Sequence, residues 1–241
     1  MIAKTKAIVL HQIKYSDSGI VAQMYTRKSG RQSFLIRGMR NRKCGRHNVL
    51  FQPMVILDLV TYQKESRSMQ MLKEFSVSYA PAGIYADTYK NCIAIFLSEV
   101  LTSVLREESA NEPLFDYLEE SIIYFDRSIA GISNFHIAFL SSLSGYLGFE
   151  PGRRKSHCDR YFDMLNGRFV SQPPPHGHYS IPEISDILAD FFSASFDSAA
   201  RITLSGKMRN EVLETILRYF SLHLPGLKRI NSIGVMKEIF T

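Results

Sequence analysis

The sequence predicts an α+β protein of two domains, an OB-type β-barrel over residues 1–80 followed by an all-α helical domain over residues 81–241. The hydrophobic period is close to 2 before residue 80 and close to 3.6 after it. The charge changes at the same place. Residues 1–80 hold 14 Lys and Arg against 4 Asp and Glu, a net charge of +10, whereas residues 81–241 have a net charge of −4. A basic, strand-rich first part and a mildly acidic, helical second part indicate two modules, the first facing a polyanion.

Composition and motifs exclude several classes of protein. Hydrophobic residues make up 45% and charged residues 22% of the 241 residues, which is typical of a globular protein. No apolar run reaches about 18 residues, and the N-terminus lacks a signal-peptide pattern, so we expect a cytoplasmic protein. Cys44, Cys92 and Cys158 form neither a disulfide framework nor a C-x-x-C motif. Phosphate-loop, H-E-x-x-H and G-x-S-x-G motifs are absent from the sequence, and we expect no enzymatic activity.

Five short strands are predicted in the first 80 residues, at residues 3–13, 20–26, 33–37, 49–62 and 69–77. Residues 28–31 form the turn between the second and third strands, because Gly30 can adopt a positive φ. Alternation places Ile20, Ala22 and Met24 on one face, and Pro53 predicts a bulge or an edge. Five antiparallel strands of this length favour an OB-type barrel, although an SH3-like barrel has the same pattern.

Helices are predicted after a boundary at residues 79–83. The first carries an apolar face over residues 93–104. The second is capped by Asn111, and the third is opened by Ser133 and ended by Gly148. A capping-box sequence at residues 180–183 opens a fourth helix, and the last runs over about residues 205–224. Between the third and fourth helices, residues 150–179 form an insertion that we expect to be irregular because it contains three consecutive prolines.

The strongest chemical signal is a basic segment with no acidic residue between positions 18 and 57. The guanidinium group of arginine suits phosphate oxygens, and aromatic rings stack on bases. We therefore predict nucleic-acid binding, with Tyr25 and Phe34 as stacking residues. The competing interpretation is a solvated basic face without a partner. The predicted DNA-binding residues are Arg27, Lys28, Arg31, Arg37, Arg40, Arg42, Lys43 and Arg46.

Residues of types that can bind a metal ion occur at two places in the insertion, His157-Cys158-Asp159 and His176-x-His178. Structural zinc sites usually have two ligands separated by two to four residues, and the side chains of adjacent His and Cys diverge. We therefore predict no bound metal and no cofactor. His136 lies beside an apolar helix face and is interpreted as a packing residue.

Several segments resemble, in order and spacing, the RecO family of bacterial recombination and repair proteins. They are residues 4–10 (KTKAIVL), 15–21 (YSDSGIV), 35–40 (LIRGMR), 143–151 (LSGYLGFEP), 219–224 (YFSLHL) and 228–232 (KRINS). The resemblance covers nearly the whole chain. It departs from the family in one respect, since many members have a four-cysteine zinc module where this sequence has only Cys158. The resemblance therefore implies a degenerate module without zinc.

The resemblance implies a nucleoid-associated protein that binds single- and double-stranded DNA and anneals complementary strands. It also implies that, with RecR, the protein assists RecA in replacing single-strand binding protein (SSB). The acidic tail of SSB requires an apolar pocket with basic residues at its rim. Our candidates for that surface are Lys207, Arg209, Lys228 and Arg229, and residues 153–155 form a rival cluster.

Two other functions fit parts of the same pattern. An OB-fold RNA-binding protein with a helical interaction domain would prefer RNA through its 2′-hydroxyl groups. A nuclease would need carboxylates beside the phosphate to hold divalent metal ions. The shortage of acidic residues in the basic segment argues against the nuclease.

Overall fold

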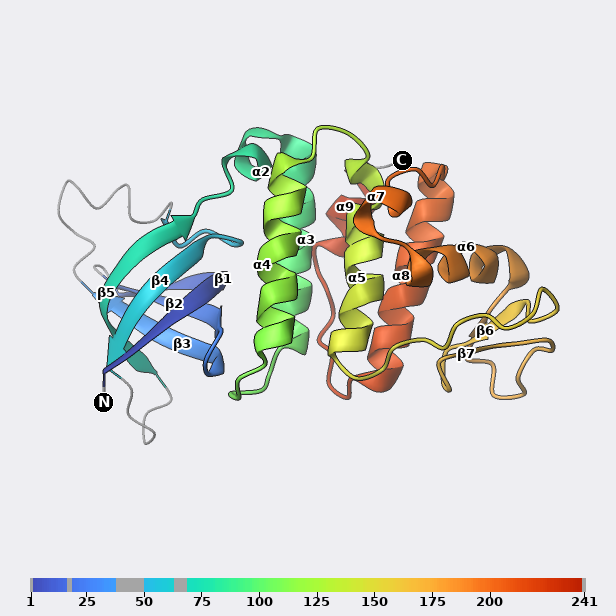
Figure 1. Cartoon of the computed structure of the whole chain (residues 1–241), viewed down its shortest axis with the longest axis horizontal. Coiled ribbons are helices and arrows are strands. Elements are labelled where there is room, and N and C mark those ends of the chain that lie inside the picture. The colour runs from blue at the N-terminus through green and yellow to red at the C-terminus, as the bar shows by residue number, and fades with distance from the viewer. Residues whose placement is uncertain (1, 17–18, 38–49, 63–68, 240–241) are drawn as a thin grey trace. The chain divides into compact units, whose positions relative to one another are not determined.

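The computed structural model describes residues 2–16, 19–37, 50–62 and 69–239 (Figure 1). The chain divides into two compact units, Met1–Arg127 and Ser128–Thr241. The strands of the barrel end at Tyr79. The division into compact units falls later, so the three helices that follow the barrel belong to the first unit.

The first unit begins with a closed five-stranded barrel in the order β1-β2-β3-β5-β4. Its strands are β1 (Ile2–Ser16), β2 (Gly19–Thr26), β3 (Gly30–Arg37), β4 (Ile56–Tyr62) and β5 (Gln70–Tyr79). Strand β1 is long enough to pair with both β2 and β4, and β3 pairs in parallel with β5. This arrangement confirms the predicted OB-type barrel.

Alternation along the strands builds the barrel core as predicted. Ile20, Ala22 and Met24 of β2 point inward, where they pack with Phe34 of β3 and with residues of β1 and β4. The start of β4 was predicted wrongly, because the strand begins at Ile56 rather than at residue 49. Pro53 lies in the turn before that strand.

Three helices complete the first unit: α2 (Ala82–Ala86), α3 (Thr88–Val104) and α4 (Glu112–Arg127). The Asn111 side chain accepts a hydrogen bond from the backbone N–H of Leu114 at 3.1 Å, which confirms the predicted cap of α4. Asp126 of α4 links the end of β5 and helix α2 to α4 through hydrogen bonds. Its carboxylate accepts hydrogen bonds from the hydroxyl of Tyr79 at 2.6 Å and from the N–H of Ile84 at 2.8 Å.

The second unit is mainly helical. After a short 3₁₀ turn (Ile132–Asn134) it contains α5 (Phe135–Tyr146), α6 (Pro182–Ser193), α7 (Phe196–Ala199), α8 (Gly206–His223) and α9 (Ile233–Ile239). Ser205 caps α8 by accepting a hydrogen bond from the N–H of Met208 at 3.2 Å. None of the described helices is long and apolar enough to cross a membrane.

Two predictions about this unit were wrong. The insertion at residues 150–179 is not irregular throughout, because it contains β6 (Tyr161–Asp163) and β7 (Arg168–Val170), which join β8 (Tyr179–Ser180) in a small sheet of order β7-β6-β8. The capping box does not form either. The N-cap of α6 is Ile181, and the Ser180 hydroxyl bonds instead to that of Ser185.

The turn between β2 and β3 contacts the α3–α4 connection closely. Gly30 has φ +59°, and a Cβ atom at this position would lie 2.4 Å from the carbonyl oxygens of Glu107 and Ser109. Only glycine allows both the left-handed conformation and this approach of two backbones.

Replacing Gly30 by Ala is expected to lower the free energy of unfolding of the first unit by about 2 kcal/mol or more, from backbone strain together with displacement of the loop. Urea denaturation followed by circular dichroism measures the change. Lys28→Ala in the same turn is the control, since its side chain is exposed. Equal stability of the Gly30→Ala variant and the wild type would contradict the close contact.

Candidate nucleic-acid interface

Arg31, a predicted DNA-binding residue, binds the end of helix α3 instead. Its guanidinium donates hydrogen bonds to the carbonyl oxygens of Thr102 at 3.0 Å and Leu105 at 3.2 Å, and to the side-chain oxygen of Gln23 at 3.0 Å. The last carbonyl groups of a helix have no partner within the helix and carry partial negative charge, so they attract a cation. Both terminal nitrogens of Arg31 are therefore engaged within the protein.

Helix α4 neutralises two further cations of the barrel. Arg27 lies 3.2 Å from a carboxylate oxygen of Glu112 and 3.1 Å from one of Asp116, and Lys6 of β1 lies 2.6 Å from one of Glu119. The three acids are spaced by four and three residues, which places them on one face of the helix. The acidic face of α4 therefore offsets part of the positive charge that the sequence concentrates in the barrel.

A groove of about 610 Å³ crosses the outside of β1, β4 and β5 next to this acidic face. Its charged lining residues are four cations and two acids: Lys4, Lys6, Arg27, Lys28, Asp58 and Glu74. Lys6 and Arg27 are already paired with acids of α4. The positive charge of this groove is therefore balanced, and the groove is a poor site for a polyanion even though Lys28 is exposed.

The predicted stacking residues Tyr25 and Phe34 are both buried. Phe34 is 0% exposed in the barrel core. Tyr25 points out of the barrel but is only 3% exposed, because its ring stacks on Phe115 of α4 with centroids 6.5 Å apart. Burial, reinforced by the nearby Glu107 carboxylate, raises the pKa of Tyr25 to about 12. Neither ring has a free face for a base, so the prediction that they stack on bases was wrong.

Five predicted DNA-binding residues of the basic segment remain, Arg37 and four residues that follow it in the sequence. Arg37 is the last residue of β3, and its backbone pairs with Gly19 of β2. Arg40, Arg42, Lys43 and Arg46 lie outside the described residues. Their assignment to nucleic acid stays a prediction from the sequence.

Exposed aromatic residues of the barrel lie elsewhere, on β1 and β4. The side chains of Tyr15 and Tyr62 are 59% and 44% exposed. Neither was among the stacking residues predicted from the sequence, although the same alternation that places Leu59 inward predicts that Tyr62 points outward.

The four candidate residues for a protein partner do not form one surface. Arg209 donates hydrogen bonds to the side-chain oxygen of Asn134 at 3.1 Å and to the carbonyl oxygen of Leu204 at 3.0 Å. Lys207 is exposed near the start of α8, whereas Lys228 and Arg229 follow its end. A helix of 18 residues is about 27 Å long. The structure therefore separates the two pairs, and Arg209 has a structural position.

Partial burial of Arg209 lowers its pKa. Full burial lowers the pKa of His136 to about 3, and the charge of Arg209 contributes to that shift. His136 is therefore neutral at physiological pH and packs in the interior of the second unit, in agreement with its interpretation as a packing residue.

The insertion does not provide the ligands of a four-cysteine zinc site. Cys158 is exposed, and within the described ranges no three His, Cys, Asp or Glu side chains form a group that could hold a metal ion. Hydrogen bonds organise the insertion instead. The carboxylate of Asp163 accepts from the N–H groups of Leu165 and Asn166 at 3.1 and 3.2 Å, and its Oδ1 lies 3.2 Å from Nε2 of His176. The described residues of the insertion therefore do not fit a structural zinc site.

Comparison with known proteins gives matches over both parts of the chain. Residues 1–80 match the family described as recombination protein O N terminal, and residues 85–231 match that described as recombination protein O C terminal. The chain is 37% identical to a DNA repair protein RecO of Bacteroides fragilis over 242 residues. It is 37% identical to that of Phocaeicola vulgatus over 241 residues and 33% identical to that of Porphyromonas gingivalis over 244 residues. Each alignment covers 100% of both chains.

Replacing Arg31 by Met is expected to lower the free energy of unfolding of the first unit by about 2 kcal/mol or more. The substitution removes a charged donor, so the carbonyl oxygens of Thr102 and Leu105 lose the hydrogen bonds that Arg31 donates to them. Urea denaturation checks the value, with Lys28→Met as a control in the same turn. Retention on a heparin column should change little in either variant, because Arg31 is engaged within the fold and Lys28 lies in the charge-balanced groove. A stable Arg31→Met protein that no longer binds heparin would restore the DNA-binding assignment of Arg31.

Proposed function

This chain belongs to the RecO family of DNA repair proteins, and from that premise we propose that it is a recombination mediator. It binds single- and double-stranded DNA, anneals complementary strands and helps RecA to load on DNA coated with SSB. Mediation of this kind needs no covalent catalysis. The observation that supports it most is the net charge of +10 in residues 1–80, the part of the sequence that forms the barrel.

The DNA-binding part of the proposal rests on five cations of one segment. They are Arg37, Arg40, Arg42, Lys43 and Arg46. The segment between positions 18 and 57 contains no acid that could offset them, in contrast to Lys6 and Arg27, which are paired with α4. We assign residues 1–80 to DNA and residues 81–241 to partner proteins, with RecR and SSB as the partners.

The acidic tail of SSB is proposed to bind near Lys228 and Arg229. Both side chains are exposed, and Leu227 and Ile230 beside them are half-buried and buried. A tail with an apolar end and a terminal carboxylate needs apolar contacts close to a cation. Arg209 is left out of this surface because its guanidinium is bound to Asn134 and Leu204.

DNA affinity is expected to fall steeply with salt. If five side chains contact phosphates of a single strand, the slope of log K against log salt should be about −3.5, from about −0.7 per contact. Replacing Arg37, Arg40, Arg42 and Lys43 together by Ala should bring the slope to about −0.7. The matched control replaces Arg153, Lys155, Arg160 and Arg201, which are exposed in the second unit. Fluorescence anisotropy of a labelled oligonucleotide measures both. A wild-type slope near zero, or equal losses in the two variants, would contradict the proposal.

An annealing assay with complementary strands tests the mediator role. The wild type should anneal both bare and SSB-coated strands, and Lys228→Glu with Arg229→Glu should lose annealing of the coated strands only. Loss with both substrates would place DNA contacts at these residues. A protein that binds RNA in preference to DNA and anneals neither substrate would support the RNA-binding alternative.

A further inference from the structure

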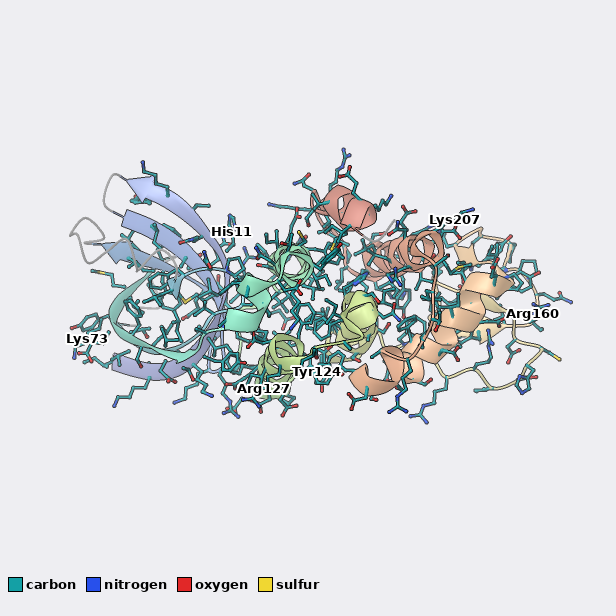
Figure 2. The ribbon with its side chains drawn as sticks, turned by 90° about the horizontal axis from the view of Figure 1, so that it is seen from above. His11, Lys73, Tyr124, Arg127, Arg160 and Lys207 are labelled. Atoms are coloured by element: carbon teal, nitrogen blue, oxygen red, sulfur yellow. The ribbon has the colours of Figure 1, made fainter. Side chains whose placement is uncertain are left out.

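A groove of about 470 Å³ in the second unit lies between helix α8 and the start of helix α6. Figure 1 shows the two helices beside each other, and in Figure 2 the label of Lys207 marks the start of α8. The volume is within the range of about 300–1,000 Å³ that is usual for ligand sites. We call this feature the α6–α8 groove. It is lined by Tyr179, Ile181 and Ile184 on one side and by residues of α8 on the other.

The wall formed by α8 is polar, and it consists of one face of the helix. Its residues follow the spacing i, i+3, i+4, i+7, which places them in a row along the helix. They are Glu211, Glu214, Thr215 and Arg218. Glu214 is paired with Lys237 of α9. The row therefore offers a ligand both signs of charge, with two carboxylates toward its start and a guanidinium at its end.

Two charged groups of this row have weak partners. The carboxylate of Glu211 has one distant neighbour among the described side chains, Nζ of Lys207 at 3.9 Å. The guanidinium of Arg218 is exposed and donates one long hydrogen bond, to the carbonyl oxygen of Gly177 at 3.5 Å. Good hydrogen bonds of this type are shorter than about 3.2 Å. Glu211 and Arg218 are therefore available for a ligand, about 10 Å apart along the helix.

The opposite wall is apolar and carries an unusual residue at a helix start. Ile181 is the N-cap of α6, and its side chain makes no cap hydrogen bond. Isoleucine is among the poorest N-cap residues, whereas Ser, Thr, Asp and Asn are preferred. The side chain of Ile181 is also 54% exposed. A residue that weakens the cap and exposes apolar surface is expected at a functional position, so this observation points to a ligand that contacts Ile181.

The same wall includes a free sheet edge. Strand β8 is the last strand of the small sheet of order β7-β6-β8. The carbonyl oxygen of His178 accepts a hydrogen bond from the N–H of Met164, which follows β6, at 3.0 Å. Backbone groups of successive residues point to alternate sides of a strand, so the N–H and carbonyl groups of Tyr179 point away from β6. An extended peptide can add to such an edge through main-chain hydrogen bonds.

We propose that the α6–α8 groove binds an extended segment of a partner protein that carries an apolar and a basic side chain. The apolar side chain packs on Ile181, the basic side chain reaches Glu211, and the backbone pairs with Tyr179. The inference rests on the proposed function, which assigns residues 81–241 to partner proteins. The groove shares no residue with the surface proposed for the SSB tail. An acidic tail is less well matched here, because two glutamates line the groove.

The probe is an array of overlapping short peptides that covers RecR, RecA and SSB of the same organism. Peptides that bind should contain Lys or Arg near an apolar residue, and fluorescence anisotropy then measures their affinity in solution. Ile181→Ser should weaken binding about fivefold or more, because the apolar contact is lost. Glu211→Lys should weaken it about tenfold or more, because like charges then face each other. The matched control is Glu150→Lys with Asp190→Lys, two exposed acids of the second unit outside the groove.

Two further readouts distinguish lost contacts from lost structure. Serine is a favourable N-cap residue, so the thermal unfolding temperature of Ile181→Ser should equal or exceed that of the wild type. A lower affinity of this variant then reports the contact and not the fold. A peptide whose basic residue is replaced by Glu should bind Glu211→Lys more tightly than it binds the wild type.

The outcomes separate this inference from the proposed function. Wild type that neither binds nor anneals DNA overturns the proposed function. Wild type that anneals DNA but binds no peptide of the array, or binds peptides as tightly after Ile181→Ser and Glu211→Lys, overturns the groove alone. Preference for acidic peptides would overturn it as well. Self-association in sedimentation that Ile181→Ser abolishes, without peptide binding, would identify a second copy of the chain as the occupant and would overturn the proposed partner.

Discussion

The guanidinium of Arg31 satisfies carbonyl oxygens at the C-terminal end of α3, and the arrangement of the first unit depends on this interaction. It holds the β2–β3 turn against the α3–α4 connection, where Gly30 lets two backbones approach and the N–H of Arg31 donates to the carbonyl oxygen of Glu107 at 3.0 Å. The acidic face of α4 follows along the same side of the barrel. Positive charge near α3 and α4 is therefore used within the fold, and we propose that the cations of the segment after β3 bind the nucleic acid.

This division explains which parts of the site could be predicted from the sequence. Alternation predicted the barrel and its inward residues, because a buried face selects apolar side chains at every second position. Alternation also places Tyr25 outward, but it carries no information on whether a helix covers that face. A count of charges cannot distinguish Arg31 from Arg37, because partners such as the carbonyl groups of α3 lie more than 70 positions away in the sequence. Tyr15 and Tyr62 could be recognised as exposed aromatic residues only from the burial of the side chains in the folded barrel.

The second unit was predicted less completely for a related reason. Asn111 caps the helix that the sequence assigned to it, and Ser205, predicted only as the approximate start of the last helix, is its N-cap; a cap is a contact over two or three residues. Strands of two or three residues, such as β6 and β8, are too short to show a period. The small sheet is held by contacts distant in sequence, including the N–H of Phe162 donating to the hydroxyl of Ser185 at 2.9 Å and Arg154 lying 4.9 Å from the ring of Phe169. These contacts organise the insertion, which lacks the four cysteines of a zinc module.

We propose that the basic residues of the barrel part are divided into residues that are paired within the fold and residues that bind DNA. Chemical acetylation of lysines, read by mass spectrometry with and without bound oligothymidylate, tests it most directly. DNA should protect Lys43, which lies in the basic segment after β3. Lys6, paired with Glu119, and Lys28, in the charge-balanced groove, should react equally in both states. Protection of Lys6 and Lys28 without protection of Lys43 would contradict the account.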